Sequence, residues 1–446
     1  MDASIVLRFD GGSISAKGYA IPHGRYDART GVYRAPALYY REIEEHLELW
    51  GVDFRDEALD APSCPSLSSD ITLRDYQQRA LEAWKTAGRR GIVVLPTGAG
   101  KTVIALKAIE ELELSALVVV PTLVLVDQWR SRLEEAFGVD IGVIGGGRHI
   151  VKGLTVSTYD SASLRADRLG NRFMLMILDE VHHLPAPSYR RIGLMYLAPY
   201  RLGLTATLER DDGAHIVLRD LVGDKVYEME VDDLAGVHLS DYTIDTLSIP
   251  LSEAEDAEYR AQYSIYRNFL RRRGIRMRSA RDYQRFVMRS GRDPEARRAL
   301  LARNRAMEIA LNSSEKVEYL KQLLRDNPGE KAIIFTQHNS LVYRISREML
   351  IPAITHQTPR DERADILQGF RSGLYRRIVT SRVLNEGVDV PDASMAVILS
   401  GTGSSREFIQ RLGRVLRKRE GKEARLVELV SKSTAETRMS RRRKEA

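Results

Sequence analysis

The sequence of 446 residues contains a single cysteine, Cys64, and this scarcity excludes several kinds of site. One cysteine forms no internal disulfide, no zinc knuckle and no cysteine-ligated iron–sulfur cluster. The thiol of Cys64 has no neighbouring base to activate it, so we expect no catalytic role for this residue. This cysteine usage favours a reducing compartment.

Long apolar runs are missing as well. No segment approaches the roughly 20 apolar residues that are needed to cross a bilayer. The N-terminal segment Met1–Phe9 lacks a basic region followed by an apolar stretch, so no secretory signal is visible. We therefore expect an intracellular protein with no membrane partner, cytoplasmic and associated with the nucleoid if its source is prokaryotic. The length of the chain predicts several domains.

A glycine-rich loop is the most informative segment that is present. It follows the apolar run Gly91–Leu95, which predicts a buried strand, and it leads into a helix expected to open at Gly100. Glycines let backbone N–H groups approach phosphate oxygens, and the helix N-terminus adds a positive dipole end. Lys101 is placed to reach the outer phosphates, and Thr102 to ligate Mg²⁺. The strict phosphate-loop pattern has a glycine where this chain has Leu95. The predicted nucleotide-binding residues of the loop are Pro96, Thr97, Gly98, Ala99, Gly100, Lys101 and Thr102.

An acidic pair follows a second apolar strand, Phe173–Leu178. Asp179 is expected to hold the same Mg²⁺, and Glu180 to polarise the attacking water. His182 and His183 adjoin this pair, but adjacent histidines have poor geometry for joint chelation, so we predict no transition-metal site. The two motifs together predict an enzyme that binds and hydrolyses a nucleoside triphosphate with Mg²⁺.

Positive charge is concentrated in one stretch of the chain. Between Arg260 and Arg305 there are 15 arginines, no lysine and 3 acids, against a net charge of +7 for the whole sequence. Arginine neutralises phosphates, so Arg271, Arg272 and Arg273 are predicted to contact a nucleic-acid backbone. Six interleaved aromatic residues either stack on bases or fill a helical core, and their spacing favours the core. The spacing of Trp129 likewise favours core packing.

The order of apolar runs predicts an α/β protein with two parallel-sheet lobes, and such lobes resemble those of RecA-like proteins. Buried strands alternate with helices over residues 91–204 and again over residues 331–430. The predicted divisions are residues 1–56 for a small N-terminal α/β domain, 57–69 for a linker, 70–235 for the first lobe and 236–446 for the second lobe, which includes a basic helical insert at about 252–305.

The second lobe has no phosphate loop of its own, but a basic helix is expected near its end. The segment Gln410–Arg417 places Arg414 and Arg417 three residues apart on one helical face, with Gln410 nearby. Arginine supplied across a cleft stabilises charge on a transferring phosphoryl group. We therefore predict that Gln410, Arg414 and Arg417 join Lys101 and Glu180 as catalytic residues.

These motifs, taken together, resemble those of superfamily 2 helicases over about residues 71–430. The Asp-Glu-Val-His sequence, the form of the phosphate loop, the N-terminal domain and the arginine-rich insert resemble the XPB family, in particular its short archaeal or bacterial type. The other segments that carry the resemblance are Leu73–Gln77, Val120–Thr122, Val156–Asp160, Thr205–Thr207, Ile334–Thr336, Thr380–Arg382 and Glu386–Asp389.

The resemblance implies a role for each matching residue. It implies a damage-recognition role for the N-terminal domain and a thumb-like role for the insert. XPB-like proteins also carry an Arg-Glu-Asp motif that acts in unwinding, for which this chain has Arg210-Asp211-Asp212, with one shorter side chain. The implied roles are adenine-site contacts by Arg74 and Gln77, further nucleotide contacts by Gly387 and Asp389, coupling by His182, Thr205, Ala206 and Thr207, and DNA contacts by Thr122, Thr158, Arg210, Asp211, Asp212, Thr336 and Thr380.

The function implied by the resemblance is an ATP-dependent 3′-to-5′ DNA helicase or translocase that opens DNA in nucleotide excision repair. Its expected partners are single-stranded, forked or damaged DNA and, as in many archaeal relatives, a structure-specific nuclease. Two alternatives stay open. One is an RNA helicase, because backbone contacts do not distinguish the sugars unless the 2′-OH is bound. The other is a DNA-opening scaffold that recruits a nuclease and unwinds little.

Overall fold

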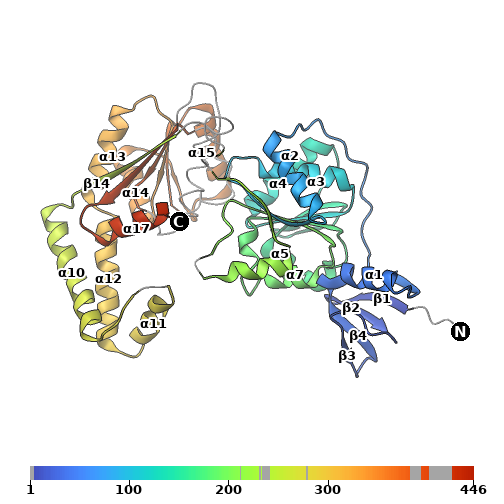
Figure 1. Ribbon diagram of the computed structural model, residues 1–446. Helices are drawn as coiled ribbons and strands as arrows, with labels where there is room; N and C mark the ends of the chain where they lie inside the picture. The colour runs from blue at the N-terminus through green and yellow to red at the C-terminus, as the bar shows by residue number, and fades with distance from the viewer. Residues whose placement is uncertain are drawn as a thin grey trace. The chain divides into compact units, whose positions relative to one another are not determined.

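The chain forms two compact units, Met1–Glu230 and Val231–Ala446, each built around a parallel sheet (Figure 1). This arrangement confirms the predicted α/β class with two parallel-sheet lobes. No helix within the described ranges is both long and apolar enough to span a membrane. The computed structural model describes residues 5–210, 212–230, 233, 242–277, 280–381, 393–400 and 424–445.

A small sheet with one helix against it begins the first unit. Leu7 and Ile14 point into its core, where Ile43 and Leu47 of the helix pack against them. The sheet order is β3-β4-β2-β1-β5, antiparallel except where β5 pairs with β1. The elements are β1 (Ile5–Asp10), β2 (Ser13–Lys17), β3 (Arg25–Asp27), β4 (Val32–Pro36), the 3₁₀ turn η1 (Ala37–Tyr39), α1 (Tyr40–Leu49) and β5 (Phe54–Glu57).

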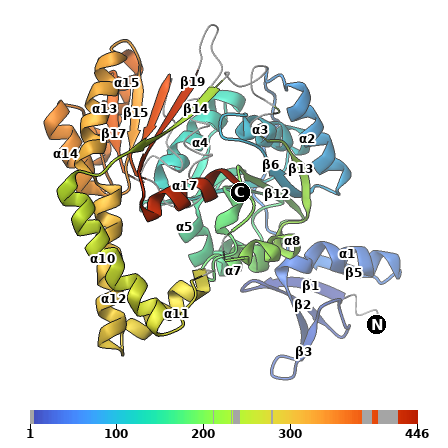
Figure 2. The ribbon, with the colours of Figure 1, turned by 60° about the vertical axis from the view of Figure 1, so that its left-hand side comes forward.

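The N-terminal domain shares its hydrophobic core with lobe 1. Leu197 of lobe 1 is fully buried in the core of the small sheet, and Leu38 of the N-terminal domain is buried in the core of the lobe. Gly12 lies so close to Met195 that a Cβ atom there would sit 2.5 Å from the methionine Cε. The Asn171 side-chain amide donates to the Ala58 carbonyl at 2.9 Å. Figure 2 shows the small sheet beside α7 of the lobe. The two parts are therefore one packed body.

The segment after β5 is extended and lies along lobe 1. The carboxylate of Glu113 accepts from the Ser66 hydroxyl and the Leu67 N–H, at 2.9 Å and 2.7 Å. The carboxylate of Glu110 accepts from the N–H and the hydroxyl of Ser69. These bonds fix the proline- and serine-rich segment to α3 (Lys101–Leu112) and the residue that follows it.

Lobe 1 has an eight-stranded sheet in the order β13-β6-β12-β11-β7-β10-β8-β9, parallel except for the β8–β9 pair. Its central strands are almost wholly buried and rich in apolar residues because helices cover both faces. Figure 1 shows α2, α3 and α4 on one face and α5 and α7 on the other. The strands are β6 (Arg90–Val94), β7 (Ala116–Val120), β8 (Gly142–Gly145), β9 (Arg148–Ile150), β10 (Leu154–Thr158), β11 (Leu175–Asp179), β12 (Tyr200–Thr205) and β13 (Lys225–Glu228). The remaining helices and turns are α2 (Asp75–Thr86), α4 (Leu123–Phe137), α5 (Tyr159–Leu164), α6 (Ala166–Leu169), η2 (Val181–His183), α7 (Arg190–Met195), η3 (Ala214–Val217) and α8 (Leu218–Leu221).

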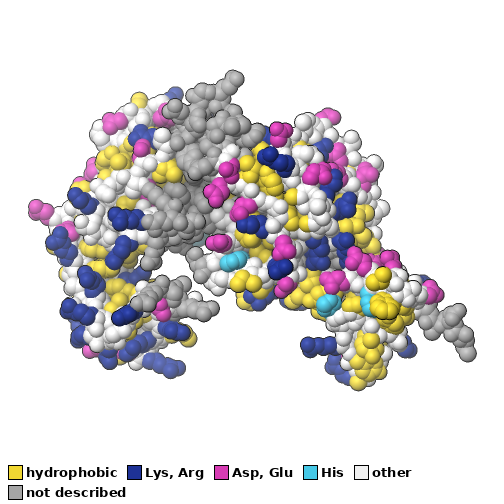
Figure 3. Space-filling view, viewed as in Figure 1, with side chains coloured by type: hydrophobic (Ala, Val, Ile, Leu, Met, Phe, Trp, Pro, Cys, Tyr) yellow, Lys and Arg dark blue, Asp and Glu magenta, His cyan; other side chains and the backbone are white. Residues whose placement is uncertain are grey.

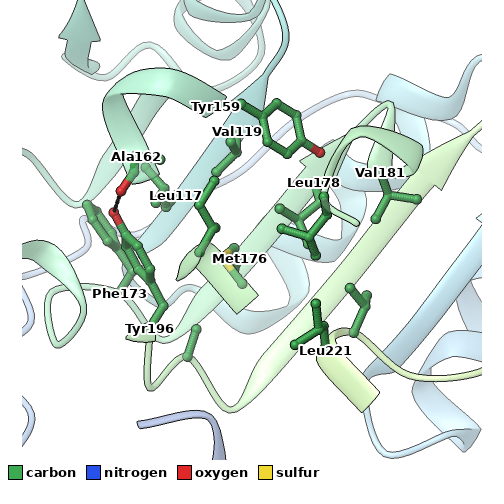
Figure 4. Packing of buried hydrophobic residues seen from close by; sticks show 14 of the residues in the cluster. Leu117, Val119, Tyr159, Ala162, Phe173, Met176, Leu178, Val181, Tyr196 and Leu221 are labelled. Carbon is green, nitrogen blue, oxygen red and sulfur yellow. Dashed lines mark hydrogen bonds between the residues drawn. The ribbon is translucent and has the colours of Figure 1, made fainter. Parts of the chain in front are cut away.

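The core of lobe 1 lies between this sheet and the helices on the α5–α7 face. Figure 4 shows Met176 and Leu178 of β11 beside Leu117 and Val119 of β7. Two tyrosine hydroxyls in this core are paired: that of Tyr196 donates to the Ala162 carbonyl at 3.0 Å, and that of Tyr159 donates to the Asp179 carbonyl at 3.1 Å. Tyr196 is therefore buried without leaving its hydroxyl unpaired.

Arg201 of β12 is fully buried, and its guanidinium bonds only to main-chain carbonyls among the described residues. Burial lowers the pKa of this guanidinium well below its usual range. Its contacts tie the ends of α7 and α8 to the strand that ends at Thr205. The accepting carbonyls are those of Gly193, Tyr196, Ala198 and Leu221, at 2.5–3.0 Å.

Lobe 2 has a six-stranded, wholly parallel sheet in the order β14-β19-β18-β15-β17-β16. Val317 and Leu320 of α13 and Val342 of α14 pack against this sheet. The strands are β14 (Tyr242–Ile249), β15 (Ala332–Phe335), β16 (Ala353–Ile354), β17 (Arg377–Thr380), β18 (Met395–Ile398) and β19 (Ala424–Ser431). The helices that accompany them are α13 (Ser314–Asp326), α14 (Asn339–Met349), α15 (Arg360–Ser372) and α17 (Ala435–Glu445).

The arginine-rich insert consists of three helices, α10 (Glu253–Arg272), α11 (Ala280–Ser290) and α12 (Pro294–Leu311). Its interleaved aromatics form a core: Tyr266, Phe269 and Phe286 are buried together against alanines of α12. The prediction that these aromatics fill a helical core is confirmed. Basic side chains cover the outside of the insert in Figure 3.

The C-terminal helix α17 is fixed to lobe 2 by a buried charge pair. Lys316 Nζ lies 2.5 Å from Glu436 Oε2 and donates to the Leu399 carbonyl at 3.0 Å, and both side chains are 1% exposed. On its other side, α17 contacts α10, because the Arg438 guanidinium donates to the Tyr263 hydroxyl at 2.9 Å. The helix therefore joins the sheet of lobe 2 to the insert.

Candidate active site

The glycine-rich loop connects β6 to α3, and its backbone takes a conformation that suits glycine. Gly98 and Gly100 have φ angles of 89° and 79°, in the left-handed region. Gly100 caps α3, as the sequence predicts. A Cβ atom at Gly100 would sit 2.4 Å from the Gln77 side-chain nitrogen, so another residue there would displace that side chain and strain the backbone. The loop thus presents backbone N–H groups at a helix N-terminus, an arrangement that binds phosphate.

Two side chains of this loop are placed for an anionic ligand. Lys101 Nζ donates to the carbonyls of Leu95 and Pro96, at 2.8 Å and 3.2 Å, which holds the ammonium over the loop. The Thr97 hydroxyl oxygen is buried and has no hydrogen-bond partner within the part of the chain that the structure describes. A buried hydroxyl without a partner is costly, and a phosphate oxygen would supply the missing partner.

Gln77 packs against the back of the loop. Its side-chain amide donates to the Ala99 carbonyl at 3.0 Å, while its oxygen accepts from the Arg74 N–H at 3.0 Å. The Tyr76 hydroxyl donates to the same Ala99 carbonyl at 2.7 Å. Arg74 and Gln77 were predicted as adenine-site residues, and α2 places both beside the phosphate loop.

Asp179 and Thr102, the predicted magnesium ligands, are both held by side chains of α4. The Trp129 indole N–H donates to Asp179 Oδ2 at 2.8 Å, and the Arg132 guanidinium donates to the Thr102 hydroxyl at 2.9 Å. Burial raises the pKa of the Asp179 carboxyl, opposed by the Trp129 bond and the positive charges of Lys101 and Arg132. Sequence reasoning identified Trp129 only as a core residue and missed Arg132. Their i, i+3 spacing on an amphipathic helix was the available signal.

Glu180, the predicted general base, occupies a strained position. Its φ angle is 51°, which a non-glycine residue adopts at a cost of about 1–3 kcal/mol. Its carboxylate lies 3.4 Å from His182 Nδ1, and the same nitrogen lies 3.0 Å from the Thr205 hydroxyl. The Thr205 hydroxyl donates in turn to the Thr207 carbonyl at 2.8 Å. Among the predicted coupling residues, Thr205 therefore contacts His182 of the catalytic turn directly, and Thr207 is bonded to Thr205.

Arg210 lies on the same loop as Thr207 and bonds back to the catalytic turn. One guanidinium nitrogen donates to the His182 carbonyl at 2.7 Å. The other two donate to the Asp212 carboxylate, at 3.0 Å and 2.7 Å. The sequence predicts that Arg210 and Asp212 contact DNA, and the structure pairs them with each other and with the His182 backbone.

The four predicted DNA-contacting threonines lie where parallel strands end. Thr122 and Thr158 cap α4 and α5, and their hydroxyls accept from Leu125 N–H and Ser161 N–H. In lobe 2, Thr336 and Thr380 are fully buried and their hydroxyls donate to nearby main-chain carbonyls. Ligands of open parallel sheets bind at this end of the strands.

Several predicted site residues fall where no structure is described. The structure therefore brings together the lobe 1 residues and leaves the lobe 2 contribution a prediction. The residues concerned are Asp211, Gly387, Asp389, Gln410, Arg414 and Arg417.

Three sequence families match separate parts of the chain. Residues 7–58 match the Xeroderma pigmentosum group B helicase damage recognition domain, and residues 70–210 match the Type III restriction enzyme res subunit. Residues 315–419 match the helicase conserved C-terminal domain. The helicase domain of Hef from Pyrococcus furiosus has the same fold, with a TM-score of 0.54 at 19% identity over 82% of this chain and 97% of that one.

One relative matches from end to end. The DNA 3′-5′ translocase XPB2 of Sulfurisphaera tokodaii is 44% identical over 99% of this chain and 100% of its own length. The chain belongs to the XPB family of DNA helicases. Other XPB proteins are longer, since this chain covers 58% of the Mycobacterium tuberculosis DNA 3′-5′ helicase XPB at 30% identity. It covers 47% of the Saccharomyces cerevisiae general transcription and DNA repair factor IIH subunit XPB/SSL2 at 28% identity.

Proposed function

We propose that this XPB-family chain is an ATP-driven DNA helicase and translocase that moves 3′ to 5′ and opens DNA for nucleotide excision repair. One observation carries the proposal. The phosphate loop, Asp179–Glu180 and the Thr205 turn follow β6, β11 and β12, which are neighbours in the sheet order β6-β12-β11. The full-length relative named as a DNA 3′-5′ translocase supports the substrate and the polarity.

The side chains of lobe 1 fit ATP and Mg²⁺. The loop offers backbone N–H groups, the Lys101 ammonium and the buried Thr97 hydroxyl to phosphate oxygens. Thr102 and Asp179 supply the hard oxygen ligands that Mg²⁺ prefers. When bound, the metal neutralises charge that develops on the phosphates, and Glu180 orients and polarises the attacking water.

The second lobe would complete the reaction. We infer from the motifs alone that Arg414 and Arg417 stabilise the transferring phosphoryl group and that Gln410 assists them. Gly387 and Asp389 would contact the nucleotide. These residues lie outside the described ranges.

DNA contacts in this proposal go to the backbone. Thr122, Thr158, Thr336 and Thr380, with Arg271–Arg273 of the insert, would bind sugar and phosphate. Such contacts carry no base sequence, so sequence preference should be weak and salt dependence steep. A structure-specific nuclease is the proposed protein partner, and a DNA-acting enzyme of this kind would work inside the cell, near the nucleoid of a prokaryote.

The test is ATP turnover of the full chain at fixed low salt, without nucleic acid and then with single-stranded, duplex and forked DNA and with RNA. We expect strong stimulation by DNA, best by forks, and weak stimulation by RNA. Equal or better stimulation by RNA would overturn the DNA assignment. DNA stimulation without strand separation on forked duplexes would favour an opening scaffold over a helicase.

A further inference from the structure

The contacts of Arg210 connect two loops that leave adjacent strands. β11 and β12 pair in parallel, with Asp179 opposite Leu204, so the turn after β11 and the loop after β12 emerge side by side. The first turn carries Glu180 and His182. The second loop carries Thr205, Thr207 and Arg210, and Asp212 lies beyond them in the sequence.

The Asp212 carboxylate fixes the orientation of the Arg210 guanidinium, which also bonds to the first turn. Its Nε and one terminal nitrogen form a two-pronged pair with the Asp212 carboxylate, and the remaining terminal nitrogen bonds the His182 carbonyl at 2.7 Å. The Ala214 N–H also bonds the Asp212 carboxylate, at 3.0 Å. The Arg210 guanidinium holds the pKa of Asp212 well below its usual range, so this carboxylate stays charged. A two-pronged arginine–carboxylate pair fixes the plane of the guanidinium, which a lysine cannot reproduce.

The turn that Arg210 contacts, through the His182 carbonyl, is the turn in which Glu180 has a strained backbone. Glu180 has a left-handed φ of 51°, and such a conformation persists only when surrounding contacts impose it. On one side, the His182 ring is held by the Thr205 hydroxyl. On the other side, the His182 carbonyl is held by Arg210. The two bonds reach the turn from the two ends of one loop.

We propose that Arg210 is a positioning residue for ATP hydrolysis, which, with Asp212, holds the His182 backbone and thereby keeps Glu180 in its hydrolytic orientation. This inference rests on the proposed function of the site.

The test compares Arg210→Lys and Asp212→Asn with the unaltered chain. We expect DNA-free ATP kcat to fall by about ten- to a hundredfold in both variants, because small misplacements of a catalytic group cost that much. The KM for ATP and the Kd for single-stranded DNA should stay within about twofold. Asp212→Glu, which keeps the carboxylate, should recover part of the rate.

Arg219→Lys is the matched control. Arg219 and Asp224 form an exposed arginine–aspartate pair of the same lobe, with N–O at 3.0 Å, that touches neither loop. We expect no change in its ATP turnover. A thermal unfolding midpoint is recorded for every variant, and Asp212→Asn, at an exposed position, serves if Arg210→Lys does not fold.

Two outcomes overturn the inference. Unchanged DNA-free kcat with weakened DNA binding would make Arg210 a direct phosphate contact. A fall in kcat that is accompanied by a lower thermal unfolding midpoint, and that Asp212→Glu does not reverse, would make the pair merely structural. Either result leaves the proposed function intact, whereas absence of ATP turnover in the unaltered chain would remove the proposed function itself.

Discussion

The two parallel sheets use the carboxyl ends of their strands differently. In lobe 1, side chains of α4 and of the loop after β12 bond to the predicted catalytic segments: Trp129 to Asp179, Arg132 to Thr102, and Arg210 to the His182 backbone. In the described part of lobe 2, the hydroxyls of Thr336 and Thr380 donate to main-chain carbonyls, and the Ser400 hydroxyl accepts from the Gln337 N–H at 2.8 Å. The buried charges of lobe 2, Lys316 and Glu436, hold the C-terminal helix instead.

The two lobes therefore differ in what their polar contacts hold in place. The lobe 1 contacts surround predicted catalytic residues, whereas the buried pair of lobe 2 fixes a helix to its sheet. The lobe 1 bonds hold side chains or backbone of the predicted catalytic segments in place. The buried pair of lobe 2 connects α13, the end of β18 and α17, none of which bears a predicted catalytic side chain. Breaking the first kind should therefore change rates, and breaking the second should change stability.

The largest effect is expected at the general base. Glu180→Gln should lower ATP turnover by about 10²- to 10⁴-fold, the usual contribution of acid–base catalysis. Nucleotide binding should persist because the phosphate loop is unaltered. Steady-state turnover and equilibrium binding of an ATP analogue measure the two. Glu135→Gln, an exposed glutamate of α4, is the isosteric control, and persistent turnover in Glu180→Gln would remove the assignment.

The buried pair of lobe 2 should produce the largest loss of stability. Lys316→Met leaves Glu436 buried and unpaired, which costs about 3–5 kcal/mol in free energy of unfolding. Replacing both, as Lys316→Met with Glu436→Leu, should recover most of that cost. Calorimetry measures the free energy of unfolding of each variant. Nucleotide binding by unit 1 is the internal reference that reports whether the first unit stays folded.

Lys321→Met is the control for the buried pair. Lys321 forms ion pairs with Glu318 and Glu348 that are partly exposed, and such pairs contribute about 1 kcal/mol or less. If the double variant is no more stable than Lys316→Met alone, the unpaired charge is not the cause of the loss.

A smaller, pH-dependent effect is expected in the N-terminal domain. Burial raises the pKa of Glu44 from an ordinary 4.5 to about 7. The folded state therefore binds this proton more tightly than the unfolded state, so the contribution is full below about pH 4.5 and is lost as pH rises to about 7. Glu44→Gln should remove this slope and raise the free energy of unfolding at pH 8 by about 1–2 kcal/mol, a value reduced for partial exposure.

Unfolding profiles between pH 4 and 8 test this prediction. Glu45→Gln, a neighbour on α1 whose carboxylate pairs with Arg41 at 2.7 Å, is the control and should keep the slope. An unchanged slope in Glu44→Gln would assign the pH dependence to another group.

The smallest effect is expected on the surface of the insert. Arg271 and Arg272 are exposed and have no carboxylate partner among the described residues. Replacing either by alanine should weaken DNA binding several-fold and reduce the slope of log affinity against log salt by about one. Arg305→Ala, whose guanidinium already pairs with Glu258 and Glu308, is the control. A fall in DNA-free ATP turnover would contradict a purely electrostatic role.

The strands of the sheet interior were predictable because burial on both faces makes them rich in apolar and β-branched residues. Ala116–Val120 and Leu154–Thr158 appear with the predicted bounds. The edge strands β9 and β13, and β8 next to β9, were not predicted. They are short, and β13, Lys225–Glu228, is polar, because an edge strand needs no apolar run to be paired.

Site residues were predictable where all members of a motif are close together in the sequence. The phosphate loop and the Asp179–Glu180 pair each span only a few consecutive residues. The supporting bonds of Trp129, Arg132 and Arg210 join residues 50, 30 and 28 positions apart, and no local pattern encodes such pairs. The roles of Thr122 and Thr158 as helix caps were open to prediction, since threonine before a helix is a common cap.

The shared core of the N-terminal domain and lobe 1 has a consequence for how this enzyme would inspect DNA. Leu197 of lobe 1 is buried in the core of the N-terminal domain, and Leu38 of the N-terminal domain is buried in the core of lobe 1, so the two parts pack as one body. Under the proposed function, the N-terminal domain would meet DNA at a fixed distance from the phosphate loop and would move along DNA only together with lobe 1. The spacing of the DNA sites that it contacts would then equal the translocation step of the enzyme.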